Sequence, residues 1–525
     1  KFFREIYNKT DFKNTYLDEF LGDAYTIINP YTYLVADYLA KSAGLSFSPS
    51  RIYYIPSHIR KDTVADGSDI QDRLVNLINV PDINLRSNLY TTEDFLDSLQ
   101  VSKNYMADQN LYIRERIFDM WTGDWNKTNE NWEWQSHTVN DSVIYTPIVI
   151  DRNHAFTKVD GVLFKQMLKM LSLDFICNYD SLILKDTKKI NKLAFALDMA
   201  VAGRSDESVW IRQAQEIQRQ MTDSLIDSAF TYLPEGVKHD EIELIKRKLK
   251  RRRLELEAVA SQYYRLLQRT PVVAGTNQSD YFLIERQAPD RTVLRIYDPE
   301  TGDCRLEQQF SGKETKELWL YGLAGNDTFE VKGNTRKDFP IYLISGEGEN
   351  QYQLNHNRKI HVYDKDYKYD YQKIKYHKIS FTPWGIYDSD KGISLGTFFT
   401  YTMYGFKRAP FTYQHRIGYN YLKGFMYAGI FPNYDDRRRL YLNASISSPR
   451  NFENFFGFGN NTAGYKEEKK NYNRVKLRTY MFNPSFEMDL RKEEVMTFFG
   501  SLDMYKAKRT DDRYIYTVYG EDHPI

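Results

Sequence analysis

The 525-residue chain carries 72 basic and 71 acidic residues, so its net charge of +1 gives no reason to expect a nucleic-acid partner. This length exceeds one ordinary domain and predicts about three. Two distant cysteines, Cys177 and Cys304, without a CxxC spacing argue against a zinc site and a disulfide-stapled fold. No window approaches the roughly 18 apolar residues of a membrane-spanning helix. The first residues, KFFREIYN, lack a signal-peptide core, so either the protein is not exported or residue 1 is not the native start.

The first 270 residues are expected to be mostly helical. YTYLVADYLAKSAGL predicts a helix that ends at Gly44, and the residues from Thr91 onward are typical of a helix start. An amphipathic helix is expected over 109–122, where Gly123 stops it.

Two further helices are expected over 206–233 and 240–267, the first ending at Pro234. The second contains the basic run KRKLKRRR, 246–253. Apolar residues hold helical register through this run and glutamates follow it, so we interpret it as a solvated helix face rather than a phosphate-binding patch.

One stretch, 116–156, holds four of the seven tryptophans and most of the candidate ligands. WEWQSHTVNDSVIYTPIVID alternates about an Asn-Asp turn, which predicts a β-hairpin whose second strand ends in an acidic residue. A helix, a polar loop, a hairpin and an acidic residue follow one another in this stretch. We therefore expect an active site here if this part of the chain has one. The polar residues concerned are Asp119, Asp124, Asn126, Asn131 and Asp151.

Residues 271–370 read as short strands. LAGNDTFEV and GEGENQYQL superpose with Gly325 on Gly348 and Asp327 on Asn350, a spacing of 23 residues. Two such copies predict stacked rungs of a small β-roll with glycine at the corner. Asp327 is then a candidate calcium ligand, and the alternative is a structural turn without metal.

From residue 371 to 525 the chain predicts antiparallel strands that are apolar on one face and polar on the other, such as FTYQHRIGYNY at 411–421 and LYLNASIS from Leu440. Strands of about 9 to 11 residues with this alternation are the signature of an outer-membrane β-barrel, and the alternative is a soluble antiparallel sandwich.

Several segments in order along the chain resemble one family of large Gram-negative outer-membrane proteins. They are GDW, NW, DRN-AF, MTDSLI, LKRRRLELEAVASQYYRLL, LWLYGLAGNDTFEV and FENFFGFGNNT. Long members of that family combine a calcineurin-like metallophosphoesterase, a region related to HipA-like and CotH-like kinases, a β-rich segment and a barrel of the bacterial surface antigen type. FFGFGNNT is similar to a motif of those barrels.

The resemblance implies a multidomain α+β protein: a helical kinase-like region at 1–270, a β-rich connector at 271–370 and part of an outer-membrane barrel, about eight strands, at 371–525. No GDxH or GNHE pair occurs, so a phosphoesterase and the kinase-like lysine would lie before residue 1. About eight strands is half of the sixteen that such barrels have. We therefore expect this chain to be an internal piece of a longer one.

The family's loop resembles GDWDRHxxQW, which places Asn126 where the family has its base. An amide cannot accept a proton at neutral pH, so Asn126 marks a degenerate base position beside Asp124. Asn131 and Asp151 match positions that would bind magnesium, but the second acid of the DRDxAF element is Asn153, which weakens such a site.

The sequence therefore favours an outer-membrane barrel protein with a degenerate kinase-like region, periplasmic or at the surface. Its role would be structural or in export and assembly, with membrane lipid and other envelope proteins as partners. No cofactor is expected apart from candidate magnesium and calcium. The alternatives are a magnesium-dependent nucleotide-binding or phosphotransfer enzyme, part of a metallophosphoesterase whose catalytic domain lies upstream, and a soluble binding protein.

Overall fold

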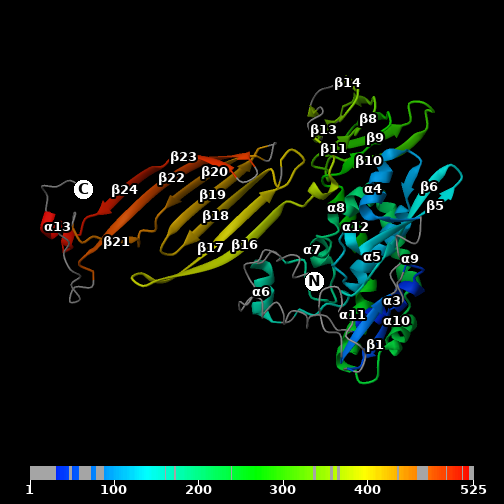
Figure 1. Ribbon diagram of the computed structural model, residues 1–525, viewed down its shortest axis with the longest axis horizontal. Coiled ribbons are helices and arrows are strands. Elements are labelled where there is room, and N and C mark those ends of the chain that lie inside the picture. Colours follow the sequence, from blue (N-terminus) through cyan, green and yellow to red (C-terminus); the bar gives the residue numbers. More distant parts are fainter. Residues whose placement is uncertain are drawn as a thin grey trace. The chain divides into compact units, whose positions relative to one another are not determined.

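The protein is a mixed α+β molecule in this computed structural model (Figure 1). The residues described are 31–46, 50–57, 72–78, 88–159, 161–170, 173–237, 239–334, 338–354, 359–363, 367–408, 410–433, 437–457, 471–491, 494–510 and 512–519. The amino-terminal KFFREIYN and part of the surface-antigen-like FENFFGFGNNT lie outside them. Two compact units form: unit 1 comprises 1–165 and 174–372, and unit 2 comprises 166–173 and 373–525. The predicted connector, 271–370, groups with the helical region.

Helices dominate the first part of unit 1. The expected ends are confirmed: α3 is followed by Gly44 at a φ of 66°, Thr91 caps α4, and Gly123 ends α5 at a φ of 79°. The helices are α3 (Thr32–Ser42), α4 (Thr92–Val101), α5 (Gln109–Thr122), α7 (Thr187–Ile190), α8 (Phe195–Ala202), α9 (Glu207–Gln220), α10 (Asp223–Ala229), α11 (His239–Arg253) and α12 (Leu256–Leu267). One further helix, α6 (Val162–Met170), belongs to unit 2 from residue 166 onward.

Two predicted helices are each divided. The segment expected at 206–233 ends as α9 at Gln220, and Thr222 starts α10 by accepting a hydrogen bond from the Leu225 amide at 3.2 Å. A threonine in the extended conformation is a favourable N-cap, so local capping wins over the continuous apolar periodicity. The segment expected at 240–267 is divided between α11 and α12.

The predicted hairpin of unit 1 is confirmed. β5 (Trp132–Val139) and β6 (Ser142–Val149) pair antiparallel about Asn140, whose φ of 53° suits a tight turn. β3 (Leu89–Thr91) and β4 (Tyr105–Ala107) complete a four-stranded sheet. A second hairpin pairs β1 (Ser50–Ile55) with β2 (Arg73–Ile78).

The β-rich part of unit 1 is a stack of parallel rungs. One sheet contains β7 (Val272–Ala274), β11 (Leu318–Tyr321), β13 (Ile341–Ile344) and β15 (Ile360–Tyr363). The other contains β8 (Tyr281–Gln287), β12 (Thr328–Gly333) and β14 (Gln351–Leu354), extended antiparallel by β9 (Arg291–Tyr297) and β10 (Cys304–Ser311). A buried core fills the space between them, formed by residues such as Val273, Phe282, Leu320, Phe329 and Leu343.

The stack has three similar rungs where the sequence predicts two. Asp280 occupies in the first rung the position of Asp327 in the second and Asn350 in the third. The rings of Phe282 and Phe329 stack with centroids 4.6 Å apart, and Tyr352 continues the column at 5.7 Å. Because β9 and β10 are inserted after the first rung, its distance along the chain is 47 residues rather than 23, which hides the repeat.

Unit 2 is built on a nine-stranded antiparallel sheet. Its strands are β16 (Lys378–Asp388), β17 (Gly392–Met403), β18 (Tyr413–Asn420), β19 (Gly424–Pro432), β20 (Arg438–Ile446), β21 (Phe452–Asn454), β22 (Arg474–Arg491), β23 (Glu494–Phe499) and β24 (Leu502–Lys508), followed by helix α13 (Tyr514–Tyr519). Within the residues that could be searched, none of the helices has the length and apolar character needed to cross a membrane.

Candidate functional site

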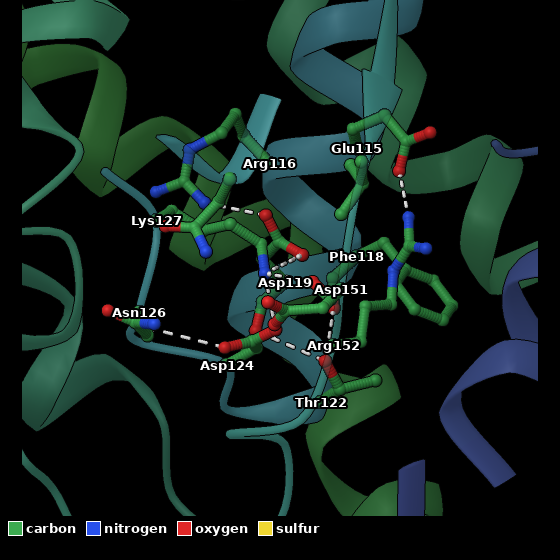
Figure 2. Close-up of polar contacts among 12 residues, drawn as sticks. Glu115, Arg116, Phe118, Asp119, Thr122, Asp124, Asn126, Lys127, Asp151 and Arg152 are labelled. Atoms are coloured by element: carbon green, nitrogen blue, oxygen red, sulfur yellow. Dashed lines mark hydrogen bonds and ion pairs between the residues drawn. The ribbon is translucent and has the colours of Figure 1, made fainter. Parts of the chain in front are cut away.

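The candidate site of unit 1 lies where α5 ends and the polar loop begins. Gly123 turns the chain with its amide on the Asp119 carbonyl at 2.8 Å, and the Asp124 amide donates to the same oxygen at 2.9 Å. A Cβ at residue 123 would lie 2.7 Å from the ring of Tyr179, so both conformation and space require glycine. The turn aims Asp124 back toward α5, and β6 brings Asp151 to the same place (Figure 2).

The centre of this site is the ammonium group of Lys127. The side chain is fully buried, its Nζ donates to the Asp124 carboxylate and to the Asp151 carbonyl at 3.1 Å, and Asp119 Oδ1 lies 3.7 Å away. Figure 2 shows the Lys127 side chain beside these aspartates. The protein therefore supplies its own cation to the acidic cluster.

The charges of the cluster explain its titration. Burial alone lowers the pKa of Lys127, but Asp119, Asp124 and Asp151 outweigh it and hold this pKa above its ordinary value, so the amine stays charged. Burial raises the pKa of Asp124 to about 6, against the opposing effect of Lys127 and with the help of the other two aspartates. The Asp124 carboxylate is thus easier to protonate than an ordinary aspartate, although it contacts the Lys127 ammonium.

A second buried cation, Arg116, connects α5 to the rest of the helical region. Its guanidinium donates to Asp198 Oδ1 at 2.8 Å, to Asp119 Oδ2 at 2.8 Å and to Asn191 Oδ1 at 2.6 Å. The hydroxyls of Tyr112 and Tyr263 also donate to Asp198, at 2.7 and 2.5 Å. Each charge in this network has an opposite charge in contact, as burial of ions requires.

Next to the Arg116 network, Arg152 forms an ion pair with Glu115 at 2.5 Å and donates to the Ser46 carbonyl at 2.8 Å. The Ser46 hydroxyl and amide both donate to Glu115 Oε1, at 2.7 and 2.8 Å. Burial raises the pKa of Glu115, which the arginine and these bonds oppose. This network fixes the segment after α3 against α5.

The remaining predicted site residues have structural partners. Asn131 Oδ1 accepts from the Thr128 amide at 2.8 Å and from its hydroxyl at 2.9 Å, which closes a short 3-10 turn, Asn129–Asn131. The backbone amide of Asn126 donates to Asp124 Oδ1 at 3.3 Å. The side-chain oxygen of Asn126 is buried and has no hydrogen-bond partner in the described structure. Asp151 Oδ1 accepts from the Asn153 amide at 3.3 Å.

The tryptophans of the stretch pack the core. Trp125, Trp132 and Trp134 are buried, and Trp134 stacks on Phe95 of α4 with ring centroids 3.7 Å apart. His154 lies edge-on to Trp125 at 4.7 Å, and burial lowers its pKa to about 4, so it is neutral at pH 7.

The basic run of α11 differs in part from the predicted solvated face. Lys246, Lys250 and Arg253 pair with carboxylates of neighbouring helices or of their own. Arg252, however, is buried and donates to the carbonyls of Trp121 at 2.8 Å and Met120, the last turn of α5. A guanidinium at a helix C-terminus satisfies carbonyls that have no partner within the helix.

This arrangement does not fit a magnesium ion. Magnesium prefers anionic oxygens in an octahedral shell. Here the Asp124 carboxylate forms an ion pair with the Lys127 ammonium, and the Asn131 side-chain oxygen accepts a hydrogen bond from Thr128. Within the residues that were searched, no three acidic, histidine or cysteine side chains are grouped to hold a metal. The site can stabilise the turn between α5 and the hairpin, and it lacks a proton acceptor at residue 126.

Asp327 is equally unsuited to calcium. Its Oδ1 accepts from the Asp280 amide at 2.8 Å, and the side chain is buried against Gly322, where a Cβ would lie 2.1 Å from Oδ2. Burial raises its pKa to about 8. Among the described residues, no group of three acidic, histidine or cysteine side chains surrounds it to complete a calcium shell. The nearest cation is the chain's own Lys103, whose Nζ lies 3.2 Å from Asp298 and 4.0 Å from Asp280.

The sequence interpretation missed the cations of both places. Lys127, Arg116, Arg152 and Lys103 are not among the candidate residues that the sequence indicates. The sequence carried no clear signal for them, because Glu115, Arg116 and Asp119 belong to an amphipathic helix, in which charged side chains ordinarily face water.

Comparison with known proteins identifies no family. No protein-family model and no curated protein matches the chain. Among solved structures, the crystal structure of a Helicobacter pylori proinflammatory kinase, CtkA, is similar at 15% identity, covering 45% of this chain and 86% of that chain with a TM-score of 0.27. A TM-score this low carries no argument about this protein's fold or activity.

Proposed function

We propose that this protein is an outer-membrane β-barrel protein whose helical region is a degenerate, kinase-like scaffold without phosphotransfer activity. Its role is structural or in export and assembly, with lipid and other envelope proteins as partners. Two independent observations support the proposal, one in each unit.

The observation that carries the membrane assignment is an uninterrupted apolar row across the sheet of unit 2. Seven strands, β16 to β20, β22 and β24, contribute directly opposed residues: Phe381, Phe399, Ile417, Tyr427, Ala444, Phe482 and Leu502. Several of these side chains are widely exposed, 53% for Phe399 and 62% for Leu502. An exposed apolar surface of this extent marks contact with a membrane or a partner.

The next row along the strands is polar and lies on the opposite face. It comprises Ser380, Thr400, Arg416, Ala428, Asn443 and Asn483. β16 and β17 contain 11 and 12 residues. At about 3.4 Å per residue and a tilt of about 45°, such strands rise roughly 26 to 29 Å, the height of the apolar band of a barrel wall.

The observation against phosphotransfer is the buried pair of Lys127 and Asp124. Phosphotransfer needs a carboxylate that orients the acceptor hydroxyl and further oxygens that hold magnesium. Here the Asp124 carboxylate is paired with the Lys127 ammonium, and Asn126 has no basic lone pair at neutral pH.

The localisation is tested by fractionating cells that express the full-length protein. We expect it in the outer membrane, with electrophoretic mobility that changes on heating. A freely soluble full-length protein would contradict the proposal.

Charge on the two faces of β18 gives a sharper test. Ile417→Arg places a cation on the apolar face and is expected to cost about 2–4 kcal/mol in a bilayer, which abolishes the heat-modifiable species. Gln414→Arg, on the polar face of the same strand, is the matched control and is expected to assemble normally. If a soluble protein left this face in water, Ile417→Arg would cost less than about 0.5 kcal/mol, and equal assembly of both variants would count against the membrane.

Nucleotide binding is tested by thermal unfolding with magnesium-ATP. Because Lys127 fills the acidic cluster, we expect no shift of the transition of unit 1, with ATP alone and magnesium alone as controls. A saturable rise of the transition temperature that depends on both would favour the enzyme hypothesis.

A further inference from the structure

The polar face of the unit 2 sheet is hollowed. A cavity of about 370 Å³ opens over β17 to β20 and β22. Most of its lining residues belong to two polar-face rows, and Tyr427 and Ala444 of the apolar row, which runs between those two rows, also line it. The first is the row of Arg416 described above. The second runs Thr382, Phe398, Gly418, Met426, Ser445 and Met481.

Small residues at two positions create this hollow. Ala428 lies between Arg416 and Asn443 in the first row, so a long side chain is absent at its centre. In the second row the ring of Phe398 lies over Gly418, where a Cβ would be 2.3 Å from the ring. The floor is therefore apolar, and the long side chains of Arg416 and Met426 stand at its sides.

The charge of the cavity is positive and unpaired. Arg416 donates from Nε to Thr400 Oγ1 at 3.2 Å, and its guanidinium carbon lies 5.7 Å from the centroid of Phe398. In the part of the chain that the structure describes, Arg416 has no ion pair, and no carboxylate lines the cavity. Arg439 on the same face differs, because it pairs with Asp489 at 3.5 Å.

We propose that this cavity binds an organic anion, a monocarboxylate with an aliphatic chain. The carboxylate of this ligand binds the Arg416 guanidinium, and its aliphatic chain packs against Phe398, Met426 and Met481.

Three features support this class of ligand. A guanidinium forms two parallel hydrogen bonds with a carboxylate, and the contact with Thr400 and Phe398 holds it in place. Asn443 and Ser445 add neutral polar groups beside it. An apolar floor with a few polar groups at one side, at a volume between about 300 and 1,000 Å³, is the usual form of a small-molecule site.

The inference is independent of the proposed function. Apart from Tyr427 and Ala444, the lining residues lie on the face opposite the apolar row, so Arg416 and the apolar floor are available whether that row contacts lipid or another protein. Loss of one proposal leaves the other standing.

The test is equilibrium dialysis of radiolabelled octanoate against the purified full-length protein, in one detergent throughout. We expect one saturable site per chain. Unlabelled octanoate should compete, whereas acetate lacks the chain and 1-octanol lacks the charge, so each should compete at least about tenfold more weakly.

Three variants locate the site. Arg416→Gln is expected to weaken binding at least about tenfold, because a charge-assisted pair is lost. Ala428→Leu fills the hollow and is expected to abolish binding while keeping the charge. Arg439→Gln is the matched control on the same face and should bind as the parent does.

Circular dichroism and thermal unfolding report whether each variant folds. Absence of saturable octanoate binding to the parent protein overturns the inference. So does undiminished binding to folded Arg416→Gln or folded Ala428→Leu, or competition by 1-octanol equal to that by octanoate. If Arg416→Gln does not fold, Ala428→Leu and the 1-octanol competition decide the question.

Discussion

Replacing Lys127 by methionine is expected to lower the free energy of unfolding of unit 1 by about 3–5 kcal/mol. Methionine keeps the length of the side chain but leaves Asp119, Asp124 and Asp151 without their shared ammonium in a buried site. Denaturant unfolding followed by tryptophan fluorescence measures the loss, since the tryptophans of 116–156 pack beside the cluster.

The loss should depend on pH. Without the ammonium the pKa of Asp124, already raised to about 6, rises further, and the folded state takes up a proton that the unfolded state does not hold. The deficit is therefore expected to be larger at pH 8 than at pH 5, where protonation relieves the repulsion.

The matched control is Lys185→Met. This lysine forms an exposed pair with Asp180, with half of its side chain in water, and its loss is expected to cost less than about 1 kcal/mol. Adding Asp124→Asn to Lys127→Met removes one buried charge and should recover part of the stability. If Lys127→Met costs no more than Lys185→Met, the ammonium does not hold the cluster together.

Asp327→Asn is expected to flatten the pH dependence of stability of the rung stack. Burial raises the pKa of this carboxyl from its ordinary value of 3.8 to about 8 in the folded protein. Between these values the folded state binds a proton that the unfolded state releases. Stability therefore falls by up to about 1.4 kcal/mol per unit as pH rises from about 4 to 8, and it is constant above that.

An amide at this position has no proton to lose and keeps the needed acceptor. Asn350 already shows this in the third rung, where its Oδ1 accepts from the Asp327 amide at 2.9 Å. The variant should therefore be more stable than the parent at pH 8 and similar to it near pH 4, below which the parent carboxyl is protonated in both states.

Thermal unfolding at several pH values measures the stability of the parent protein and of Asp327→Asn. The raised pKa of Asp280 leaves a residual slope of the same sign, which Lys103 opposes. A variant whose slope equals that of the parent would show that Asp327 is ionised in the folded state.

Local signals predicted much of the fold and few of the contacts of the site. Gly123, the Thr91 cap and the Asn140 turn act through the backbone of neighbouring residues, so sequence alone revealed them. The alternation of strands also predicted the two faces of the unit 2 sheet.

Partners that are distant along the chain were not predictable in this way. Arg116 meets Asp198 across 82 positions, and Lys103 meets Ser279 across 176. A single sequence does not tell which of several charges will share a buried site. The first rung was hidden for the related reason that an inserted hairpin changes the spacing of the repeat.

That insertion lengthens one side of the rung stack only. The hairpin of β9 and β10 continues the sheet of β8, β12 and β14 beyond the first rung, in the same hydrogen-bonding direction in which the rungs stack, and Phe282 still stacks directly on Phe329. Each strand adds about 4.8 Å in that direction, whatever the number of residues between rungs. This sheet therefore has five strands where the rungs alone supply three, while the facing sheet of β7, β11, β13 and β15 has four.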